Sequence, residues 1–113
     1  MSLSKDLVAA SATPLVLSIL ARGESYGYAI IKRVRELSGG QMQWTDGMLY
    51  PVLHRLERQG FIEARWGASE NGRKRKYYSL REKGIEELRL QRNQWMQVHE
   101  TLQKSWEEKP CLT

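Results

Sequence analysis

The feature that most constrains the fold of this chain is a change in the period of its apolar residues at Gly60. Before this glycine, apolar residues recur at the three- and four-residue spacing of amphipathic helices. Over Phe61–Leu80, apolar and charged residues alternate as in a half-buried strand, and Asn71-Gly72 is a strong hairpin-turn signal because both residues tolerate a positive φ. The side chains predicted to point inward from the first strand are Ile62, Ala64 and Trp66.

Three helices are predicted before this hairpin and one long helix after it. The first covers Ser4–Ala21, with a kink or a fresh start at Pro14 because proline lacks an N–H. The second begins at a Ser25 N-cap, and Gly39-Gly40 stops it. Its buried face is predicted to carry Ile30, Val34 and Leu37. The fold class is therefore mostly α with a small β-hairpin (α+β), a winged helix-turn-helix followed by a long C-terminal dimerisation helix.

The third helix, Thr45–Gln59, is predicted to be the recognition helix of the helix-turn-helix, with Thr45 or Asp46 as its N-cap. At 100° per residue, the inward set is Leu49, Val52, Leu53 and Leu56. The outward set is small near the start and basic toward the end: Gly47, Pro51, His54 and Arg58, edged by Met48 and Arg55 on one side and by Tyr50 on the other. In a helix-turn-helix the N-terminal residues of this helix meet base edges, so Thr45 and the residues of this face and its edges are predicted DNA contacts. A plain amphipathic helix with a solvated face would show the same pattern.

The net charge of +5 and the pI of about 9.6 favour a polyanionic partner. Four consecutive cations follow the hairpin turn: Arg73, Lys74, Arg75 and Lys76. A hairpin tip is where a winged protein reaches the DNA backbone or minor groove, so these four are predicted DNA contacts. Further candidate phosphate contacts at the start of the second helix are Tyr26, Tyr28 and Lys32. The alternative for the two tyrosines is packing against the third helix.

The last helix is predicted from Glu82 to Glu108, roughly 40 Å at 1.5 Å per residue, which exceeds the length of so small a core. Leu88, Trp95 and Leu102 recur every seven residues, and Ile85, Val98 and Trp106 widen this apolar stripe. The stripe is predicted to meet a second copy of the chain. Trp95 from each copy, facing across a dimer axis, would sandwich a flat aromatic ligand. Plain packing of the tryptophans, or packing of the stripe on the chain's own first helix, are the alternatives.

No catalytic, cofactor or metal site is predicted. His54 and His99 lie on separate helices, and Cys111 is a single cysteine near the C-terminus. No glycine-rich phosphate loop and no zinc-ligand spacing are present, so the chain is not expected to be an enzyme. The longest apolar stretch, Leu7–Leu20, is too short to span a bilayer, and with no signal peptide the protein is expected to be cytoplasmic, without a membrane partner.

Several segments of the chain resemble the PadR-type transcriptional regulators, in the short form with a single C-terminal dimerisation helix. They cover about Leu15–Leu88: Tyr26-Gly27-Tyr28-Ala29-Ile30, Asp46-Gly47-Met48-Leu49-Tyr50-Pro51-Val52-Leu53-His54-Arg55-Leu56-Glu57, Gly60-Phe61-Ile62, Arg75-Lys76-Tyr77-Tyr78-Ser79-Leu80 and Lys83-Gly84. The resemblance implies a winged helix-turn-helix homodimer that represses transcription from double-stranded operator DNA. Residues 1–80 would form the DNA-binding domain and residues 81–113 the dimerisation helix and a short tail. Some relatives release DNA on binding a small molecule, often aromatic.

Two positions depart from the family pattern. Met48 stands where members often have a small polar residue, so a contact with a thymine methyl replaces a hydrogen bond to a base edge. Arg81 stands where members often have Thr, which affects the capping of the last helix and not its existence. The expected function is a sequence-specific, dimeric repressor released by a small aromatic effector. The alternatives are a winged-helix protein-interaction module and a non-specific DNA binder.

Overall fold

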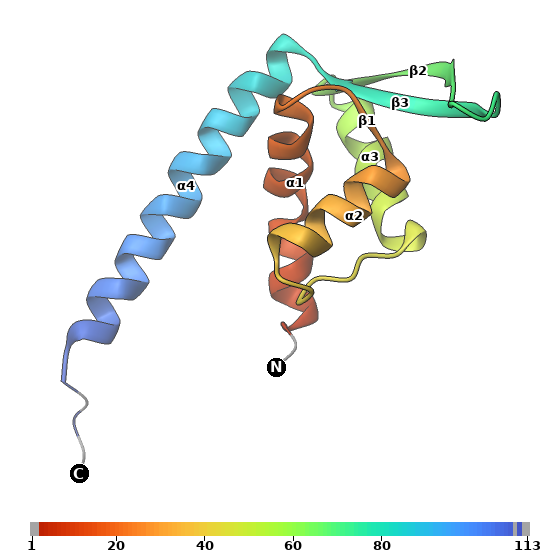
Figure 1. Ribbon diagram of the computed structural model, residues 1–113. Coiled ribbons are helices and arrows are strands. Elements are labelled where there is room, and N and C mark those ends of the chain that lie inside the picture. The colour runs from red at the N-terminus through yellow and green to blue at the C-terminus, as the bar shows by residue number, and fades with distance from the viewer. Residues whose placement is uncertain (1–2, 110, 112–113) are drawn as a thin grey trace.

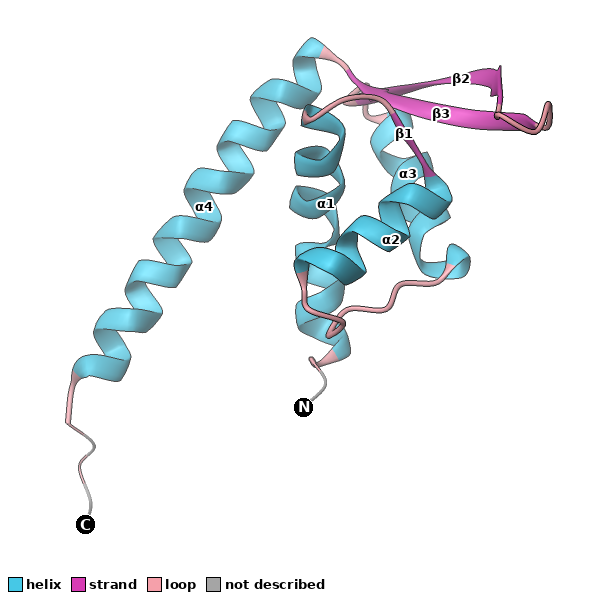
Figure 2. Cartoon of the chain, in the orientation of Figure 1, coloured by secondary structure: helices cyan, strands magenta, loops and turns pink. Residues whose placement is uncertain are grey.

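The computed structural model describes residues 3–109 and 111 and shows a small helical body from which a long helix and a hairpin extend (Figure 1). Its principal extents are 65 × 30 × 20 Å. Along the chain the elements are α1 (Lys5–Ala21), β1 (Ser25–Tyr26), α2 (Gly27–Leu37), α3 (Asp46–Arg58), β2 (Ile62–Ala68), β3 (Lys74–Leu80) and α4 (Glu82–Glu107). Figure 2 shows the three strands grouped at one end of the body, with α1, α2 and α3 beneath them. The predicted fold class, mostly α with a small sheet, is confirmed.

Helix α1 runs without interruption through Pro14, so the expectation of a fresh helix start there was wrong. Ser4 caps its N-terminus, since the Ser4 hydroxyl accepts a hydrogen bond from the backbone N–H of Leu7 at 3.2 Å. Ala12 and Val16, on either side of the proline, are both buried in the same core. This shared packing holds the two halves of the helix together despite the missing N–H.

The second helix does not begin at a Ser25 cap, as the sequence suggested. Ser25 and Tyr26 form the short strand β1, which pairs antiparallel with β3, and α2 begins at Gly27. Pairing with a distant strand overrides the local capping signal of the serine. Leu37, predicted to be buried, is 54% exposed because it occupies the last turn of α2, beyond the core.

Strands β2 and β3 form the predicted hairpin, and β1 makes it a three-stranded sheet in the order β1-β3-β2. The connection is longer than Asn71-Gly72 suggested. Five residues, Ser69–Arg73, lie between the paired strand ends, and only Gly72 in this loop has a positive φ, of 77°. Trp66 shares a face with Ile62 but is 67% exposed, because the hairpin extends past the core. Its predicted inward packing was therefore wrong.

The core lies where α1, α2 and α3 meet the sheet. Its largest fully buried side chains come from all four elements: Leu17, Ile30, Leu49, Leu53, Leu56, Ile62 and Tyr78. Of the two predicted N-caps of α3, Thr45 is the one used, since its hydroxyl accepts a hydrogen bond from the backbone N–H of Met48 at 3.3 Å. Three of the four residues predicted to face inward from this helix are fully buried, and the fourth, Val52, is partly buried against the core.

Helix α4 is joined to the body only by its first turns. Gly84 is buried there, and a Cβ at this position would collide with the backbone carbonyl oxygen of Phe61. Leu88 is partly buried against the core. Arg81 is the N-cap and makes no side-chain cap hydrogen bond. From Arg92 to Glu108 every side chain is exposed, so that roughly 25 Å of helix projects from the body (Figure 1).

Candidate nucleic-acid interface

The outer face of α3 carries small and basic residues in contact with solvent. The four residues predicted to form its centre, Gly47, Pro51, His54 and Arg58, are all exposed. Gly47 has open space around it, since the nearest atom to a Cβ built there is the Thr45 hydroxyl oxygen at 3.9 Å. The backbone of the first turn of α3 is therefore open to close approach by a partner.

The edges of this face differ from one another. Met48 is half-buried and packs against the core, so its side chain is less available to a thymine methyl than the sequence suggested. Arg55 donates a hydrogen bond to the hydroxyl of Thr13 on α1 at 2.7 Å, which holds the guanidinium beside α1. Tyr50, on the other edge, is exposed and lies beside His54, with 6.3 Å between ring centroids.

A groove separates α3 and the start of α2 from the wing, the hairpin of β2 and β3. It has a volume of about 400 Å³ and combines aromatic rings with cations: Tyr26, Gly27, Tyr28, Tyr50, Trp66, Lys74, Arg75 and Lys76. The α2 N-terminus opens into it, and its capping residue Tyr26 makes no side-chain cap hydrogen bond. The first backbone N–H groups of a helix have no partner within the helix, so this uncapped end suits an anion. Lys32 is exposed one turn beyond Tyr28.

Gly27 makes the close contact of α2 with α3 possible. A Cβ at this position would lie 2.5 Å from the hydroxyl oxygen of Tyr50. Without a side chain at residue 27, the Tyr50 ring reaches the first turn of α2 and forms one wall of the groove. The tyrosine therefore ties the recognition helix to the same end of α2 that presents its free N–H groups.

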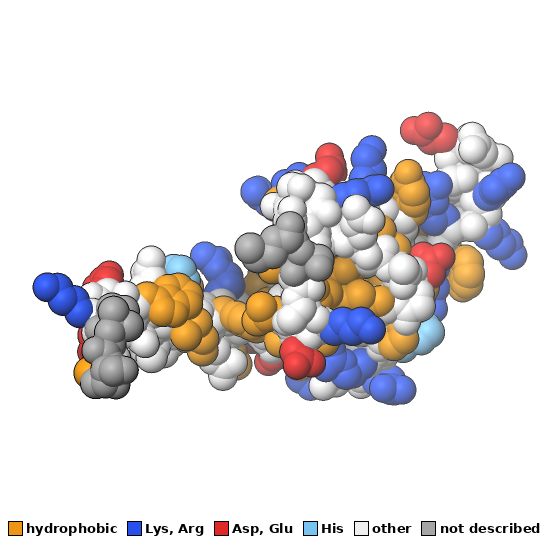
Figure 3. Space-filling view, turned by 90° about the horizontal axis from the view of Figure 1, so that it is seen from below, with side chains coloured by type: hydrophobic (Ala, Val, Ile, Leu, Met, Phe, Trp, Pro, Cys, Tyr) orange, Lys and Arg blue, Asp and Glu red, His pale blue; other side chains and the backbone are white. Residues whose placement is uncertain are grey.

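Two of the four wing cations make cation–π contacts with aromatic rings. The guanidinium of Arg75 lies 3.8 Å from the centroid of the Tyr26 ring, and the ammonium of Lys76 lies 6.0 Å from Trp66 and 5.7 Å from Tyr78. Such cation–π contacts orient the charges toward the groove. Arg73 and Lys74 are exposed near the hairpin tip. Figure 3 shows lysine and arginine side chains gathered around the wing, at the right of the view.

Three further residues of the site were missed from the sequence. Trp66 lines the groove, although alternation alone placed it in the core. Arg65 donates to the Glu24 carboxylate at 2.7 Å, and this hydrogen bond lowers the pKa of Glu24 and raises that of Arg65. The ion pair ties the segment before β1 to the wing. Its partners are 41 residues apart, so no local pattern predicts it.

Tyr78, on the central strand β3, is fully buried, with no hydrogen-bond partner for its hydroxyl among the described residues. Burial raises its pKa to about 12, with smaller contributions from the charges of Tyr50 and Glu57. The phenol therefore stays neutral over the physiological range. Its ring supports Lys76 from the core side.

The residues predicted to form a dimer seam follow one side of α4. Leu88 is partly covered by the body, but Trp95, Val98, Leu102 and Trp106 are all exposed, Trp106 by 68%. Figure 3 shows hydrophobic side chains along this projecting helix. Gln94, Trp95 and Val98 line a shallow hollow of about 270 Å³.

Within residues 3–109 and 111, no three His, Cys, Asp or Glu side chains are grouped so as to hold a metal ion. The sequence has two histidines, and they lie on different helices: His54 on α3 and His99 on α4. None of the helices described is long and apolar enough to cross a membrane.

Comparison with known proteins identifies the fold and the class. The family model described as "Transcriptional regulator PadR-like family" matches residues 16–90. Among curated proteins, the chain is 33% identical over 88 residues to "Transcriptional regulator YqjI" of Escherichia coli; these residues are 78% of the chain but 41% of that protein. It is also 29% identical over 97 residues, 86% of the chain and 89% of the relative, to an uncharacterized protein of Lysinibacillus sphaericus.

Solved structures of similar size superpose over most of the chain. A transcriptional regulator from Clostridium thermocellum matches with a TM-score of 0.82 and 28% identity, over 90% of this chain and 96% of that one. A PadR family transcriptional regulator from Eggerthella lenta matches with a TM-score of 0.79 and 31% identity, over 92% and 88% respectively.

Proposed function

Since the chain belongs to the PadR-like transcriptional regulator family, and so is a DNA-binding regulator, we propose that it acts as a homodimeric repressor of specific operators. The observation that carries the proposal is the groove between the recognition helix and the wing. There, Lys74, Arg75 and Lys76 face the free N-terminus of α2. Cations and unpaired N–H groups on one concave surface suit the phosphates of DNA.

In the proposed complex, the first turns of α3 enter the major groove. Gly47 and Pro51 allow close approach, while His54 and Arg58 follow the groove toward its rim. Tyr26, Tyr28 and Lys32 contact phosphate on the α2 side, as do the four wing cations on the other. The α3 face offers few groups that read base edges, so dimer spacing and DNA shape contribute to specificity.

The dimer is proposed to form through the exposed seam of α4, with residues 81–113 as dimerisation helix and tail and residues 1–80 as the DNA-binding domain. More than half of a 26-residue helix projects with large apolar side chains in solvent, which a second copy would cover. The seven-residue spacing of Leu88, Trp95 and Leu102 suits a partner helix. A dimer places two recognition helices on half-sites about one helical turn apart.

Release from the operator is proposed to follow binding of a small aromatic effector at the seam. Trp95 and its copy would stack on the two faces of a planar molecule. The hollow beside Trp95 and Val98 supports this position. If planar aromatic compounds neither quench Trp95 fluorescence nor weaken operator binding, this part of the proposal is wrong and the seam serves dimerisation alone.

A binding comparison tests the DNA-binding part. DNA from upstream of the chain's own gene and random DNA of the same length are titrated at about 150 mM salt. A repressor binds the upstream DNA at least about 1,000-fold more tightly and protects two half-sites in a footprint. Equal affinity for both would indicate a non-specific binder, and no affinity for either would indicate a protein-interaction module.

A reporter measurement separates repression from activation. The upstream DNA is placed before a reporter gene, and expression is compared with and without the protein. The proposal expects lower expression with the wild-type chain and recovery with Arg58→Ala, since Arg58 is exposed on α3 and makes no side-chain hydrogen bond within the described residues. Higher expression with the wild-type chain would mean that the protein activates.

A further inference from the structure

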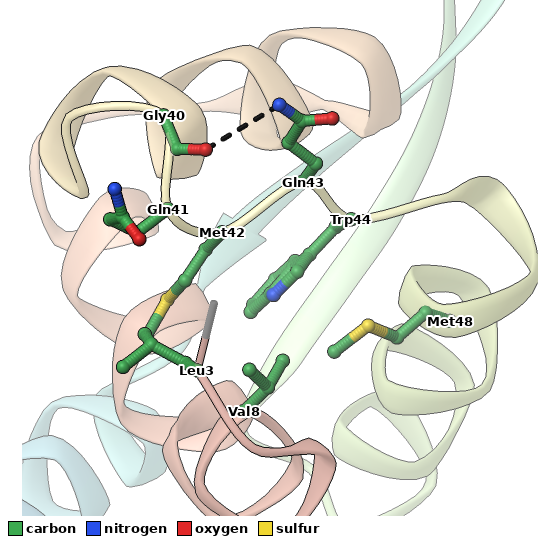
Figure 4. Close-up of a pocket in the computed structure, with 8 residues that line it drawn as sticks. All are labelled: Leu3, Val8, Gly40, Gln41, Met42, Gln43, Trp44 and Met48. Carbon is green, nitrogen blue, oxygen red and sulfur yellow. Dashed lines mark hydrogen bonds between the residues drawn. The ribbon is translucent and has the colours of Figure 1, made fainter. Parts of the chain in front are cut away.

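A second cavity lies on the far side of the recognition helix from the groove, beneath the loop that joins α2 to α3. It has a volume of about 500 Å³ and is lined by loop residues 40–44, by Leu3 just before α1 and Val8 in its first turn, and by Met48 in the first turn of α3. Figure 4 shows the indole ring of Trp44 extending from the loop between the side chains of Met42 and Met48, with Leu3 and Val8 beyond it.

The loop that forms the roof is held in place by its own hydrogen bonds. The backbone N–H of Met42 donates to the Ser38 hydroxyl at 2.9 Å, and the Gln43 amide donates to the Gly40 carbonyl at 3.4 Å. Gly40 has a φ of 86°, which only glycine adopts without strain, and it turns the chain at the rim of the cavity. The cavity is therefore a formed feature of the helix-turn-helix.

Trp44, which lines this cavity, carries an unpaired polar group. Its side chain is buried, with a relative exposure of 5%, and its indole Nε1 has less than 1 Å² of accessible surface and no hydrogen-bond partner among the described protein atoms. An acceptor on a bound molecule therefore reaches this N–H only when a neighbouring side chain shifts. A buried N–H without an acceptor costs free energy, so an acceptor supplied from outside the chain would be stabilising. The indole ring also offers an aromatic face for stacking.

The lining defines the chemistry of what fits. The lining side chains carry no charge: three of them are methionine or tryptophan, two are leucine or valine, and the polar ones are glutamines. Methionine side chains adapt to the shape of an apolar guest. An ion would lack a counter-charge there, whereas a neutral, largely apolar molecule with one hydrogen-bond acceptor matches both the walls and the Trp44 N–H.

We propose that this cavity is a binding site for a neutral, apolar small molecule that accepts a hydrogen bond from Trp44 Nε1. Occupancy changes the affinity for DNA, because the walls include the residue directly before the Thr45 N-cap and the first turn of α3. This regulatory consequence rests on the proposed DNA-binding function; the binding site itself does not. The site is separate from the Trp95 seam.

The test uses acetophenone as probe and ethylbenzene, which has a similar shape but no acceptor, as its control. The indole N–H signals of ¹⁵N-labelled protein are assigned with the variants Trp44→Phe, Trp66→Phe and Trp95→Phe. Acetophenone is expected to move the Trp44 signal downfield with saturation, and ethylbenzene to move it at least about threefold less. A Trp44 signal that does not move, or a movement seen only at Trp95, overturns the site.

The variants also serve as matched controls for affinity. Trp44→Phe keeps an aromatic ring and removes the donor, so it should abolish the preference for acetophenone over ethylbenzene. Trp66→Phe, on the exposed wing, and Trp95→Phe, on the seam, should keep it. If all three variants bind both probes alike, the hydrogen bond does not select the ligand and the proposal is wrong.

The regulatory part is tested with DNA. In wild type, saturating acetophenone should change the operator Kd at least about threefold more than saturating ethylbenzene does, and Trp44→Phe should abolish this difference. DNA should change the acetophenone Kd by the same factor as acetophenone changes the operator Kd, as linkage requires. An unchanged operator Kd overturns the regulatory part. Acetophenone is first titrated without DNA and DNA without acetophenone, so a failure of DNA binding is told apart from a failure of this site.

Discussion

The winged helix-turn-helix part and the projecting half of α4 differ in whether their apolar side chains are buried. In the first, large aliphatic residues such as Leu17 and Leu53 are fully buried within the same chain. In the second, Val98 is 50% exposed and Trp106 more so. The first part contains its own hydrophobic core. In the second, large apolar side chains are exposed, and no residue of the described part of this chain covers them.

The exposed surfaces of the two parts differ as well. The outer face of α3 and the wing expose small and cationic residues, which suit a polyanion. The projecting half of α4 exposes an apolar seam, which suits another apolar helix. One short chain thus presents two surfaces for two kinds of partner, and the short segment around Gly84 is where they join.

The largest expected effect comes from placing a charge on the seam. Val98→Asp should convert the proposed dimer to a monomer, because a carboxylate cannot be buried unpaired in an apolar interface. Loss of the second half-site should weaken operator binding about 1,000-fold, the order of magnitude that linkage of two modules contributes. Sedimentation and operator titration measure both.

Asn93→Asp is the matched control for this substitution. It adds the same carboxylate on the opposite face of α4, at 100° per residue, and should leave both the dimer and the affinity unchanged. Circular dichroism should show a folded winged part in both variants. If the Val98→Asp protein still sediments as a dimer, the seam is not the interface.

The wing tip is expected to give the next largest effect. Replacing Arg73, Lys74 and Arg75 by alanine should reduce the slope of log K against log salt by about 0.9 for each phosphate that the variant no longer neutralises. At about 0.1 M salt this corresponds to roughly eightfold weaker binding per phosphate, relative to 1 M salt. An unchanged slope in the triple variant would remove the wing from the DNA surface.

Arg65→Ala removes a wing cation that does not line the groove, and circular dichroism checks that the wing survives the loss of its ion pair with Glu24. Arg65 is a wing cation engaged with Glu24 and outside the groove lining, so its removal should change the slope less than removal of any tip residue. Because Arg75 also stacks on Tyr26, the double variant Arg73→Ala, Lys74→Ala separates direct contact from wing placement.

The joint between the two parts can be tested through Gly84. Gly84→Ala should destabilise the fold by about 2 kcal/mol, since a Cβ there collides with backbone of Phe61 that cannot move freely. Gly47→Ala is the control, because it lies on a helix in open space. It should raise stability by roughly 0.5–1 kcal/mol through helix propensity while weakening DNA binding. Thermal unfolding and operator titration distinguish the two; equal unfolding temperatures would refute the role of Gly84.

The sequence predicted correctly those features that depend on neighbouring residues alone, such as helix caps and the buried face of a helix. Thr45 caps α3, and Leu49, Leu53 and Leu56 are buried as helical periodicity requires. The errors arose where distant segments meet. Ser25 pairs with β3 instead of capping α2, and Trp66 lies beyond the edge of a core whose extent depends on tertiary packing.

In the candidate site too, features set by neighbouring residues were predictable from the sequence, and features set by distant segments were not. The exposed face of α3 was predictable from angles, because burial of one side of a helix fixes the other. The groove was not, since it is formed by α2, α3 and the wing together and needs Gly27 to admit the Tyr50 ring. The cavity under Trp44 likewise joins the start of α1 to a loop that is distant in the sequence.

The smallest expected effect concerns the core of the winged part itself. Tyr78→Phe removes a buried hydroxyl that has no protein partner among the described residues, so at pH 7 it should leave stability unchanged or raise it by up to about 1 kcal/mol. In wild type, the raised pKa of Tyr78, about 12, means that the unfolded chain releases its phenolic proton at lower pH than the folded chain. Stability from this group is therefore complete below about pH 10 and is lost as the pH rises toward 12.

Chemical denaturation at about pH 7 and about pH 11 measures this difference. Wild type should lose roughly 1 kcal/mol more than Tyr78→Phe between the two values, because one pKa unit corresponds to about 1.4 kcal/mol. The projecting half of α4 contains no tyrosine, so the Val98→Asp monomer should show the same pH dependence as wild type. If the Val98→Asp monomer loses this pH dependence, the group that ionises lies in the seam region and not in the core of the winged part. Tyr78 would then not be the cause.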